Sequence, residues 1–317
     1  MEQRYSVYST YLKEKYGEKV YKIPVNLPLT CPNRDGEVSA GGCTFCGDDA
    51  AGFECLDNKI EIKEQIKINI ERIGKKYKAK KFIVYFQNFT NTYMPLSLFE
   101  RYLEEACVEN VVELCVSSRP DCVSEAYLDV LENISVKYGV KISIELGLQT
   151  VNYHTLVKVN RGHGLAEFLD AVLRIHKRNF ETCVHLILNL PWDDEIDVLE
   201  NARIISALGI RQVKIHSLYI LRNTEMGRQY EAGEVEIAPV EEYVNRVVKF
   251  IRNVDSDVVF QRLAGRAPKE ETLFCNWNMS WWRIKDMIDE EMVKQDAYQG
   301  DQCNYLNGHA VRKFENQ

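Results

Sequence analysis

Three cysteines lie close together near the amino-terminal end of the chain, after a short run with strand character. They are Cys31, Cys43 and Cys46, separated by eleven residues and then by two. Three thiolates that hold a cubane of four irons leave one iron without a protein ligand, whereas a fourth thiolate closes the cluster and restricts it to electron transfer. The number and spacing of the cysteines therefore favour a [4Fe–4S] cluster with one iron open to a further ligand.

A structural zinc site is the second interpretation of the same residues. A Cys-x2-Cys pair with a third cysteine upstream is a common zinc ligand set, and Cys55 would supply the fourth ligand. Cys55 would equally close an iron–sulfur cluster, which gives a third interpretation, a non-catalytic binding or electron-transfer protein. Cys275 and Cys303 stay open as ligands of a second cluster.

The composition is that of a globular protein from a reducing compartment. Of the 317 residues, 45% are hydrophobic and 27% are charged, and no window holds the roughly 20 apolar residues of a membrane span. The first residues lack the apolar core of a signal peptide, so we expect the ten cysteines to stay reduced in the cytoplasm. That compartment suits an oxygen-sensitive cluster.

The net charge of −7 argues against a protein that covers nucleic acid with a uniform positive field, although it permits local basic surfaces. The densest basic cluster consists of Lys75, Lys76, Lys78, Lys80 and Lys81, and a second patch in the tail consists of Arg262, Arg266, Arg283 and Lys285. The lysines have two interpretations. They form either the solvated end of a helix, where they complement its dipole, or a contact surface for phosphates.

Apolar runs of strand length alternate with helical patterns along most of the chain. Strand-like runs lie at 20–25, 82–86, 111–116, 142–148, 184–190 and 213–220, and apolar stripes at helical spacing lie at 62–73, 128–138, 165–175 and 196–205. This alternation predicts an α/β protein with a parallel sheet and right-handed crossovers. Six units rather than eight indicate a partial (β/α)6 TIM-type barrel, in which chemistry takes place at the carboxyl ends of the strands.

We expect the barrel to occupy residues 1–222, with the cysteines in a loop spanning 26–56 after the first strand. Residues 223–317 would then form a small C-terminal extension, with a helix at 241–253 and a strand-like run at 258–263. Trp277, Trp281 and Trp282 in this extension are expected to form an apolar patch that closes the barrel, with a base-stacking platform as the alternative.

Three short segments at predicted strand or helix ends accompany the cysteines. They are Ser117-Ser-Arg-Pro-Asp121, Glu145-Leu-Gly-Leu-Gln149 and Asn160-Arg-Gly-His163. Together with the long gap between the first two cysteines, they resemble the radical SAM domain of the Elongator catalytic subunit and, most of all, the bacterial YhcC/YtqA (MnmL) family. The tail is similar too, in Arg262-Leu-Ala-Gly-Arg-Ala-Pro268 and Ala297-Tyr-Gln-Gly300. The resemblance covers nearly the whole chain and disfavours zinc.

The resemblance implies an enzyme whose three cysteines hold a [4Fe–4S] cluster that cleaves S-adenosylmethionine (SAM) to a 5′-deoxyadenosyl radical. Phe45 would lie near the adenine, Gln149 would contact the ribose, and Arg161 would pair with the methionine carboxylate, for which a guanidinium is well suited. Gln87 stands where relatives keep a Gly-Gly-Glu segment that meets the methionine amino group, but the glycines are missing here.

Three further positions are assigned to the cofactor pocket. Relatives often carry a glutamate in place of Ser117, and some carry an aspartate in place of His185, so the contacts made from these positions differ in this chain. Glu145 is the third, and it is also the carboxylate that we expect to pair with Arg161 if that arginine has only a structural role. His163 and His216 are expected at strand or helix ends that face the site, where an imidazole is able to transfer protons.

The resemblance also implies tRNA as a substrate, with the wobble uridine side chain trimmed from carboxymethylaminomethyl to aminomethyl, and a flavodoxin- or ferredoxin-type electron donor. Tyr93, Arg119 and Tyr219 would receive a base splayed from the anticodon loop, and the lysines of 75–81 would contact phosphates. A radical SAM enzyme that acts on a small molecule or peptide is the alternative, which the acidic net charge suits better. Gln149 and Arg161 argue against a non-catalytic protein with a closed cluster, because a closed cluster needs no SAM pocket.

Overall fold

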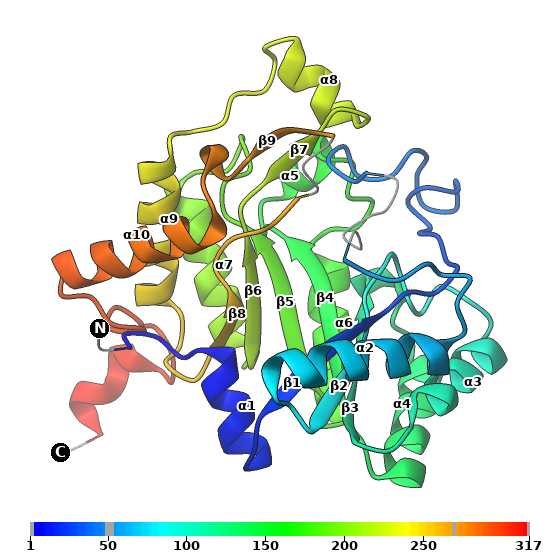
Figure 1. Cartoon of the computed structure of the whole chain (residues 1–317). Coiled ribbons are helices and arrows are strands. Elements are labelled where there is room, and N and C mark those ends of the chain that lie inside the picture. Colours follow the sequence, from blue (N-terminus) through cyan, green and yellow to red (C-terminus); the bar gives the residue numbers. More distant parts are fainter. Residues whose placement is uncertain (1–2, 48–53, 268–270, 316–317) are drawn as a thin grey trace.

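The computed structural model describes residues 3–47, 54–267 and 271–315. Seven parallel strands form one sheet, in the order β1-β2-β3-β4-β5-β6-β8, that curls into a half-barrel (Figure 1). The strands are β1 (Val20–Val25), β2 (Lys81–Phe86), β3 (Val111–Ser118), β4 (Lys141–Gln149), β5 (Glu181–Ile187), β6 (Gln212–His216) and β8 (Val259–Arg262). The expected partial TIM-type barrel is therefore confirmed, with one strand more than the sequence predicted.

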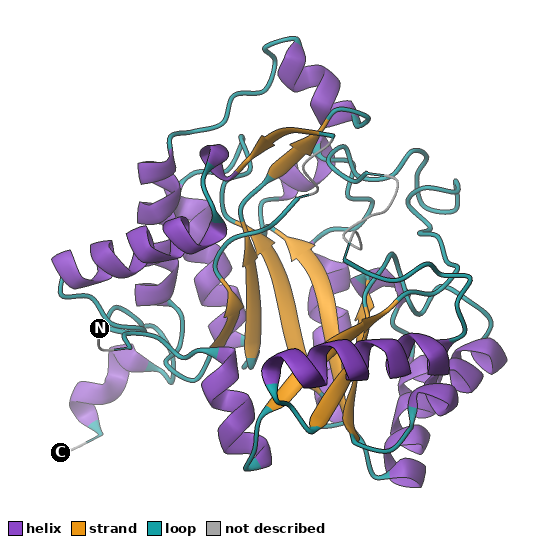
Figure 2. Cartoon of the chain, in the orientation of Figure 1, coloured by secondary structure: helices purple, strands orange, loops and turns teal. Residues whose placement is uncertain are grey.

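Helices cover the outer face of the sheet (Figure 2). Those between strands are α2 (Ile62–Tyr77), α3 (Leu96–Ala106), α4 (Glu125–Tyr138), α5 (Tyr153–Lys158), α6 (Leu165–Lys177), α7 (Glu195–Ala207) and α9 (Val240–Asn253). The longer ones bury apolar side chains on one face, as in α6, where Phe168, Val172 and Ile175 are fully buried. Gly139 ends α4 with a φ of +67°, a conformation that few other residues adopt without strain.

One predicted strand is divided in two by the tertiary structure. The run 213–220 was expected to be continuous, but β6 ends at His216 and a new strand, β7 (Tyr219–Leu221), pairs antiparallel with β9 (Thr272–Cys275). Between them the backbone N–H of Leu218 donates to Oδ1 of Asn189 at 2.7 Å, so it leaves the hydrogen-bonding pattern of the sheet. The expectation of one strand was wrong because a buried side-chain acceptor replaces the ladder.

The C-terminal extension contributes directly to the barrel. β8 pairs parallel with β6, so β1 and β8 form the two edges of the sheet. α1 (Tyr8–Tyr16) contacts both edge strands, α8 (Glu225–Glu231) contacts β7, and α10 (Trp281–Lys294) packs on α9. Single 3-10 turns lie at Pro120–Cys122, Asn276–Asn278 and His309–Phe314. The proposed division after residue 222 stays a prediction, but the sheet continues beyond it.

Alternation along the strands places apolar residues outward and polar residues inward. In β4, Ile144 and Leu146 belong to the main apolar core, whereas Glu145 between them is fully buried among polar side chains of other strands. Because all seven strands are parallel, their carboxyl ends meet at one end of the half-barrel. In the described part of the chain, no helix is both long and apolar enough to cross a membrane.

Candidate active site

The loop after β1 carries the three cysteines to the carboxyl ends of the strands (Figure 1). Its backbone is fixed on both sides of Thr44. The N–H of Thr44 donates to the carbonyl of Val159 at 3.0 Å, and its carbonyl accepts from the N–H of Met226, in α8, at 2.8 Å. The N–H of Cys46 donates to the carbonyl of Cys43 at 2.9 Å, which closes a tight turn between these two cysteines.

The segment that follows α5 clamps this loop. Nδ2 of Asn160 donates to the carbonyl of Gly42 at 2.8 Å, and Oδ1 accepts from the hydroxyl of Ser39 at 2.9 Å. In return, Nδ2 of Asn33 donates to the carbonyl of Asn160 at 2.6 Å. Gly162 has a φ of +74°, and a Cβ there would lie 2.1 Å from Oδ1 of Asn33. The backbone at this position therefore requires glycine.

Arg161 reaches from the same segment to a cysteine. Its Nη1 donates to Sγ of Cys43 at 3.4 Å and its Nη2 donates to the carbonyl of Gly147 at 2.6 Å. A Cβ on Gly147 would lie 2.7 Å from Nη2 of Arg161 and 2.9 Å from Nε2 of Gln149. The structure thus brings together two residues predicted for SAM, Arg161 and Gln149, beside one predicted cluster ligand.

A pocket opens between the cysteine loop and the strand ends. The three cysteines line it, and so do four arginines and two histidines: Arg34, Arg119, Arg161, Arg262, His185 and His216. None of its described lining residues is an aspartate or a glutamate. Arg119 is neutralised from behind by Asp121, through two hydrogen bonds of 2.9 and 2.7 Å. The remaining positive charge suits ligands with anionic groups.

Glu145 lies beneath this pocket and does not contact Arg161. Its Oε1 accepts from Nζ of Lys22 at 2.7 Å, and its Oε2 contacts Nζ of Lys214 at 2.5 Å and Nε2 of His185 at 2.7 Å. Burial alone would raise the pKa of Glu145, but Lys214 and Lys22 outweigh burial and hold that pKa well below its usual value. The expected pairing with Arg161 was wrong, because two buried lysines already bind this carboxylate.

His185 joins the buried network to the pocket. Burial and the nearby charge of Lys214 lower the pKa of His185 to about 4, so its imidazole is neutral near pH 7. The ring of His216 lies 5.2 Å from that of His185, and burial together with Arg262 holds the pKa of His216 well below its usual value. Neither histidine adds charge to the pocket near pH 7.

The comparison with known sequences identifies the family. Residues 31–205 match the radical SAM superfamily, and residues 210–294 match the radical SAM C-terminal domain. This chain belongs to the radical SAM superfamily. YtqA of Bacillus subtilis is 31% identical to it over 300 residues, which are 94% of this chain and 92% of YtqA.

Two further relatives of this radical SAM protein differ in what they share with it. Elp3 of Methanocaldococcus infernus, solved with an N-terminal deletion, superposes with a TM-score of 0.68 at 16% identity, covering 93% of this chain and 67% of that one. The tRNA uridine(34) acetyltransferase of Methanocaldococcus jannaschii is 24% identical over 155 residues, which are 48% of this chain and 28% of that protein.

Radical SAM enzymes use a [4Fe–4S] cluster, and the three cysteines fit it better than zinc. The sulfurs of a zinc site, with bonds of about 2.3 Å, lie less than about 4 Å apart. Among the described residues, Glu145, Cys183 and His185 form a group whose ligand atoms all lie within 4.8 Å of one another. The sulfurs of the three loop cysteines form no such group, so they lie too far apart to share one zinc ion. Glu145 already binds two ammonium groups, which leaves that trio unsuited to a cation.

The pocket also fits SAM, the second cofactor of the family. Nε of Arg161 and Oγ1 of Thr90 are buried there with no hydrogen-bond partner in the described structure. Buried polar atoms are nearly always paired, so these two are expected to meet a bound polar group. The thiol of Cys46 gives similar support for the cluster. Burial and the neighbouring Cys43 raise its pKa to about 12, and a bound metal would offset both effects.

Other residues predicted from the sequence divide into two groups. Phe45, Gln87, Ser117 and Tyr219 line the pocket, and their contacts to SAM or substrate stay predictions. Tyr93 is not among the lining residues. The Sγ of Cys55 contacts Oδ1 of Asn88 at 3.7 Å, and Cys55 does not line the pocket either. Residues 48–53 of the predicted cluster loop, and Pro268 of the tail motif, lie outside the described residues.

The five lysines of 75–81 do not line the cysteine pocket. They run from the last turn of α2 to the first residue of β2. Lys81 pairs with Glu18 at 2.9 Å. Tyr77, within the same stretch, stacks on Tyr21 of β1 with ring centroids 4.3 Å apart. The lysine cluster therefore borders the open edge of the half-barrel rather than the cofactor pocket.

Several residues in and beneath the site were not predicted from the sequence. Lys22 and Lys214 are charged residues at inward positions of apolar strands, an anomaly that alone signals a buried ionic network. Arg262 was expected on a basic surface, but it lines the pocket from the end of β8. The rule that strand ends carry function would have found Arg262 if the run 258–263 had been counted as a barrel strand.

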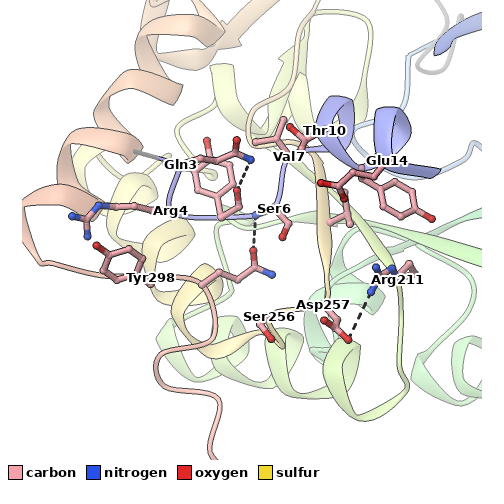
Figure 3. Close-up of a pocket in the computed structure, with 14 residues that line it drawn as sticks. Gln3, Arg4, Ser6, Val7, Thr10, Glu14, Arg211, Ser256, Asp257 and Tyr298 are labelled. Atoms are coloured by element: carbon pink, nitrogen blue, oxygen red, sulfur yellow. Dashed lines mark hydrogen bonds and ion pairs between the residues drawn. The ribbon is translucent and has the colours of Figure 1, made fainter. Parts of the chain in front are cut away.

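A different cavity, of about 470 Å³, lies near the amino ends of β6 and β8 (Figure 3). Arg4, Glu14, Arg211 and Asp257 give it charges of both signs, and its described lining contains no cysteine or histidine. It therefore lacks the residue types that hold a cluster or transfer protons. The chemistry belongs to the opposite end of the strands.

Proposed function

We propose that this radical SAM enzyme modifies the wobble uridine of tRNA, shortening a carboxymethylaminomethyl side chain to aminomethyl. The observation that carries the proposal is the similarity to a tRNA uridine(34) acetyltransferase over 155 residues, because the name of that relative specifies this nucleoside. The similarity covers 48% of this chain. The half-barrel shared with Elp3 is consistent with it.

The chemistry requires a cofactor and a susceptible bond. When bound, the reduced cluster cleaves SAM and supplies a 5′-deoxyadenosyl radical that removes a hydrogen atom from the substrate. Carbon–hydrogen bonds beside the amine nitrogen of the wobble side chain are weakened by the nitrogen lone pair, which makes them suitable targets. An electron donor of the flavodoxin or ferredoxin type would serve the cluster.

The residues of the chain bind and orient the reactants. Cys31, Cys43 and Cys46 would hold the cluster, and Arg161, which donates to the sulfur of Cys43 and the carbonyl of Gly147, would pair with the methionine carboxylate. Arg119 supports it from behind, since its Nη1 donates to the carbonyl of Arg161 at 2.9 Å. We therefore infer that Arg119 positions Arg161, and the contact with a base that the sequence predicted for Arg119 stays a prediction.

Basic side chains lie near the open edge of the half-barrel. Lys76 lies 5.1 Å from the ring centroid of Tyr77, which stacks on Tyr21 of β1, and Arg266 and Lys285 line a cavity between β1 and β8. These positive groups allow an acidic protein to bind phosphates locally, so we expect tRNA affinity to fall with rising salt. Reversing the charge of Lys75, Lys76 and Lys78 together should weaken tRNA binding and leave substrate-free SAM cleavage intact.

The test is mass spectrometry of wobble nucleosides from cells with and without the gene. Loss of the gene should raise the carboxymethylaminomethyl nucleoside and lower the aminomethyl product. A plasmid that encodes the wild-type protein or Cys107→Ala should restore the product, whereas Cys43→Ala should not. Unchanged wobble uridines would reject the tRNA substrate and favour a small molecule or peptide.

A further inference from the structure

A cavity of about 530 Å³ lies at the gap between the two edge strands of the half-barrel, and we term it the lateral pocket. Tyr21 lines it from β1, Gln261 and Arg262 line it from β8, and Trp281 and Trp282 line it from α10. β1 and β8 stand at opposite ends of the strand order and do not pair with each other. The volume falls in the range of pockets that bind small molecules or nucleosides, roughly 300–1,000 Å³.

Arg262 lines both the lateral pocket and the cofactor pocket, so its side chain lies between them. Its Nη2 contacts Nε2 of His216 at 3.4 Å, and its Nε is buried without a partner in the described structure. No ion pair to a carboxylate is found for it within residues 3–47, 54–267 and 271–315. The guanidinium therefore carries a positive charge, with no carboxylate partner among the described residues, on the boundary of both pockets.

The lateral pocket is lined by aromatic faces and cations, and also by the carboxylate of Glu54, which pairs with Arg266 at 3.2 Å. The rings of Trp281 and Trp282 lie 3.6 Å apart, and the guanidinium of Arg266 lies 4.7 Å from the ring centroid of Trp281. Trp282 is 59% exposed, although a residue that merely closed the barrel would be buried. Stacking surfaces beside positive charges are the features with which proteins bind unpaired nucleotides.

We propose that the lateral pocket receives an unpaired nucleoside whose side chain ends in an anionic group, and that Arg262 binds this group. The inference rests on the proposed function and adds the residue that selects the substrate. A guanidinium binds a carboxylate through two parallel hydrogen bonds. The carboxymethylaminomethyl side chain ends in a carboxylate and the aminomethyl product has none, so Arg262 favours the substrate over the product.

Three synthetic anticodon stem-loops test this role with the cluster-loaded protein. They carry at the wobble position carboxymethylaminomethyluridine, its methyl ester or aminomethyluridine, and their dissociation constants are measured at one salt concentration. The wild type should bind the acid most tightly. Arg262→Ala should weaken binding of the acid roughly tenfold to a hundredfold, with little effect on the other two, since it removes one charged pair. Arg262→Lys should restore part of the loss.

Two comparisons separate the charge effect from general damage. Arg101→Ala, on the exposed side of α3, should leave all three dissociation constants unchanged. Trp282→Ala should weaken all three stem-loops to a similar extent, because stacking does not depend on the side-chain charge. Iron content and substrate-free SAM cleavage should match the wild type in Arg101→Ala, and iron content is measured in every variant so that the dissociation constants compare equally loaded proteins.

The outcomes also separate this inference from the function on which it rests. If the wild type converts the acid-bearing stem-loop but Arg262→Ala keeps the full preference for the acid, the role of Arg262 is refuted and the proposed function stands. If the cluster-loaded wild type converts none of the stem-loops, the tRNA function is refuted, and the inference with it.

Discussion

The guanidinium of Arg161 donates a hydrogen bond to Sγ of Cys43 across 3.4 Å. A residue predicted to bind SAM thus also contacts a predicted cluster ligand. Both residues lie in loops, 118 positions apart, and the hydrogen bonds of Asn160 and Asn33 hold those loops together. The cysteine loop and the segment that carries Arg161 are therefore joined by hydrogen bonds into one site.

Single replacement of Cys31, Cys43 or Cys46 by Ala should abolish the cluster. Three thiolates are the minimum that holds the cubane with one open iron, so losing one leaves two. Cys55→Ala and Cys107→Ala should retain the cluster, since neither residue lines the pocket. Iron and sulfide content after anaerobic reconstitution, with the visible absorption spectrum, measures both results. A colourless protein with stoichiometric zinc would contradict the assignment.

Arg161→Ala should weaken SAM binding roughly tenfold to a hundredfold, because it removes a charge-assisted pair. Hydrogen bonds to cluster sulfurs also tune the reduction potential. Loss of the donor and of its positive charge should therefore lower the potential of the cluster, and Arg161→Lys should recover only part of each effect. Titration with SAM and spectroelectrochemistry report the two quantities separately. An unchanged dissociation constant would show that Arg161 does not bind the carboxylate.

Gly162→Ala should remove the cluster, whereas Gly147→Ala should leave it in place. A Cβ on Gly147 meets the ends of the Arg161 and Gln149 side chains, which are able to move, so the cluster should persist while SAM affinity falls roughly tenfold. A Cβ on Gly162 would lie 2.1 Å from Oδ1 of Asn33, and Gly162 itself has a positive φ that alanine adopts only with strain. The cysteine loop should therefore be displaced and the iron lost. Equal iron content in the two variants would argue against this difference.

Glu145→Ala should destabilise the fold by about 3–5 kcal/mol, the usual effect of removing one partner from a buried ionic network. The reason is that Lys22 and Lys214 would keep buried charges without a carboxylate. Chemical denaturation gives the free energy of unfolding. Glu104→Ala, which removes a partner from an exposed pair with Lys137, is the matched control and should have a much smaller effect.

Asp193 should make stability depend on pH in a definite direction. Burial raises its pKa to about 6, whereas an unfolded aspartate titrates near 3.9. The folded state therefore binds the proton more tightly, and this contribution to stability is complete below about pH 4 and lost as the pH rises through about 6. Relative to Asp193→Asn, the wild type should lose up to about 3 kcal/mol of unfolding free energy across that interval. Asp257→Asn, the same substitution at a highly exposed position, is the matched control.

The sequence alone determined the barrel, because the periodicity that predicts strands and helices is a local property of the chain. The runs at 20–25 and 82–86 became β1 and β2 within one residue, and Gly139 ended α4 where expected. The sequence also determined the family, because the cysteine spacing and the strand-end motifs are short contiguous patterns that can be read from the chain. What remained inaccessible was the pairing of residues distant in the chain.

Only the tertiary structure decided which charges meet. Glu145 and Arg161 looked like partners, but the lysines of β1 and β6 bind the carboxylate because inward positions of neighbouring strands converge inside the half-barrel. Likewise, Arg262 entered the pocket because β8 joins the sheet beside β6, a pairing with no local signature. Side-chain pattern fixes which face of a strand is buried, whereas the partner across the interior depends on strand order and register, which only the packed sheet specifies.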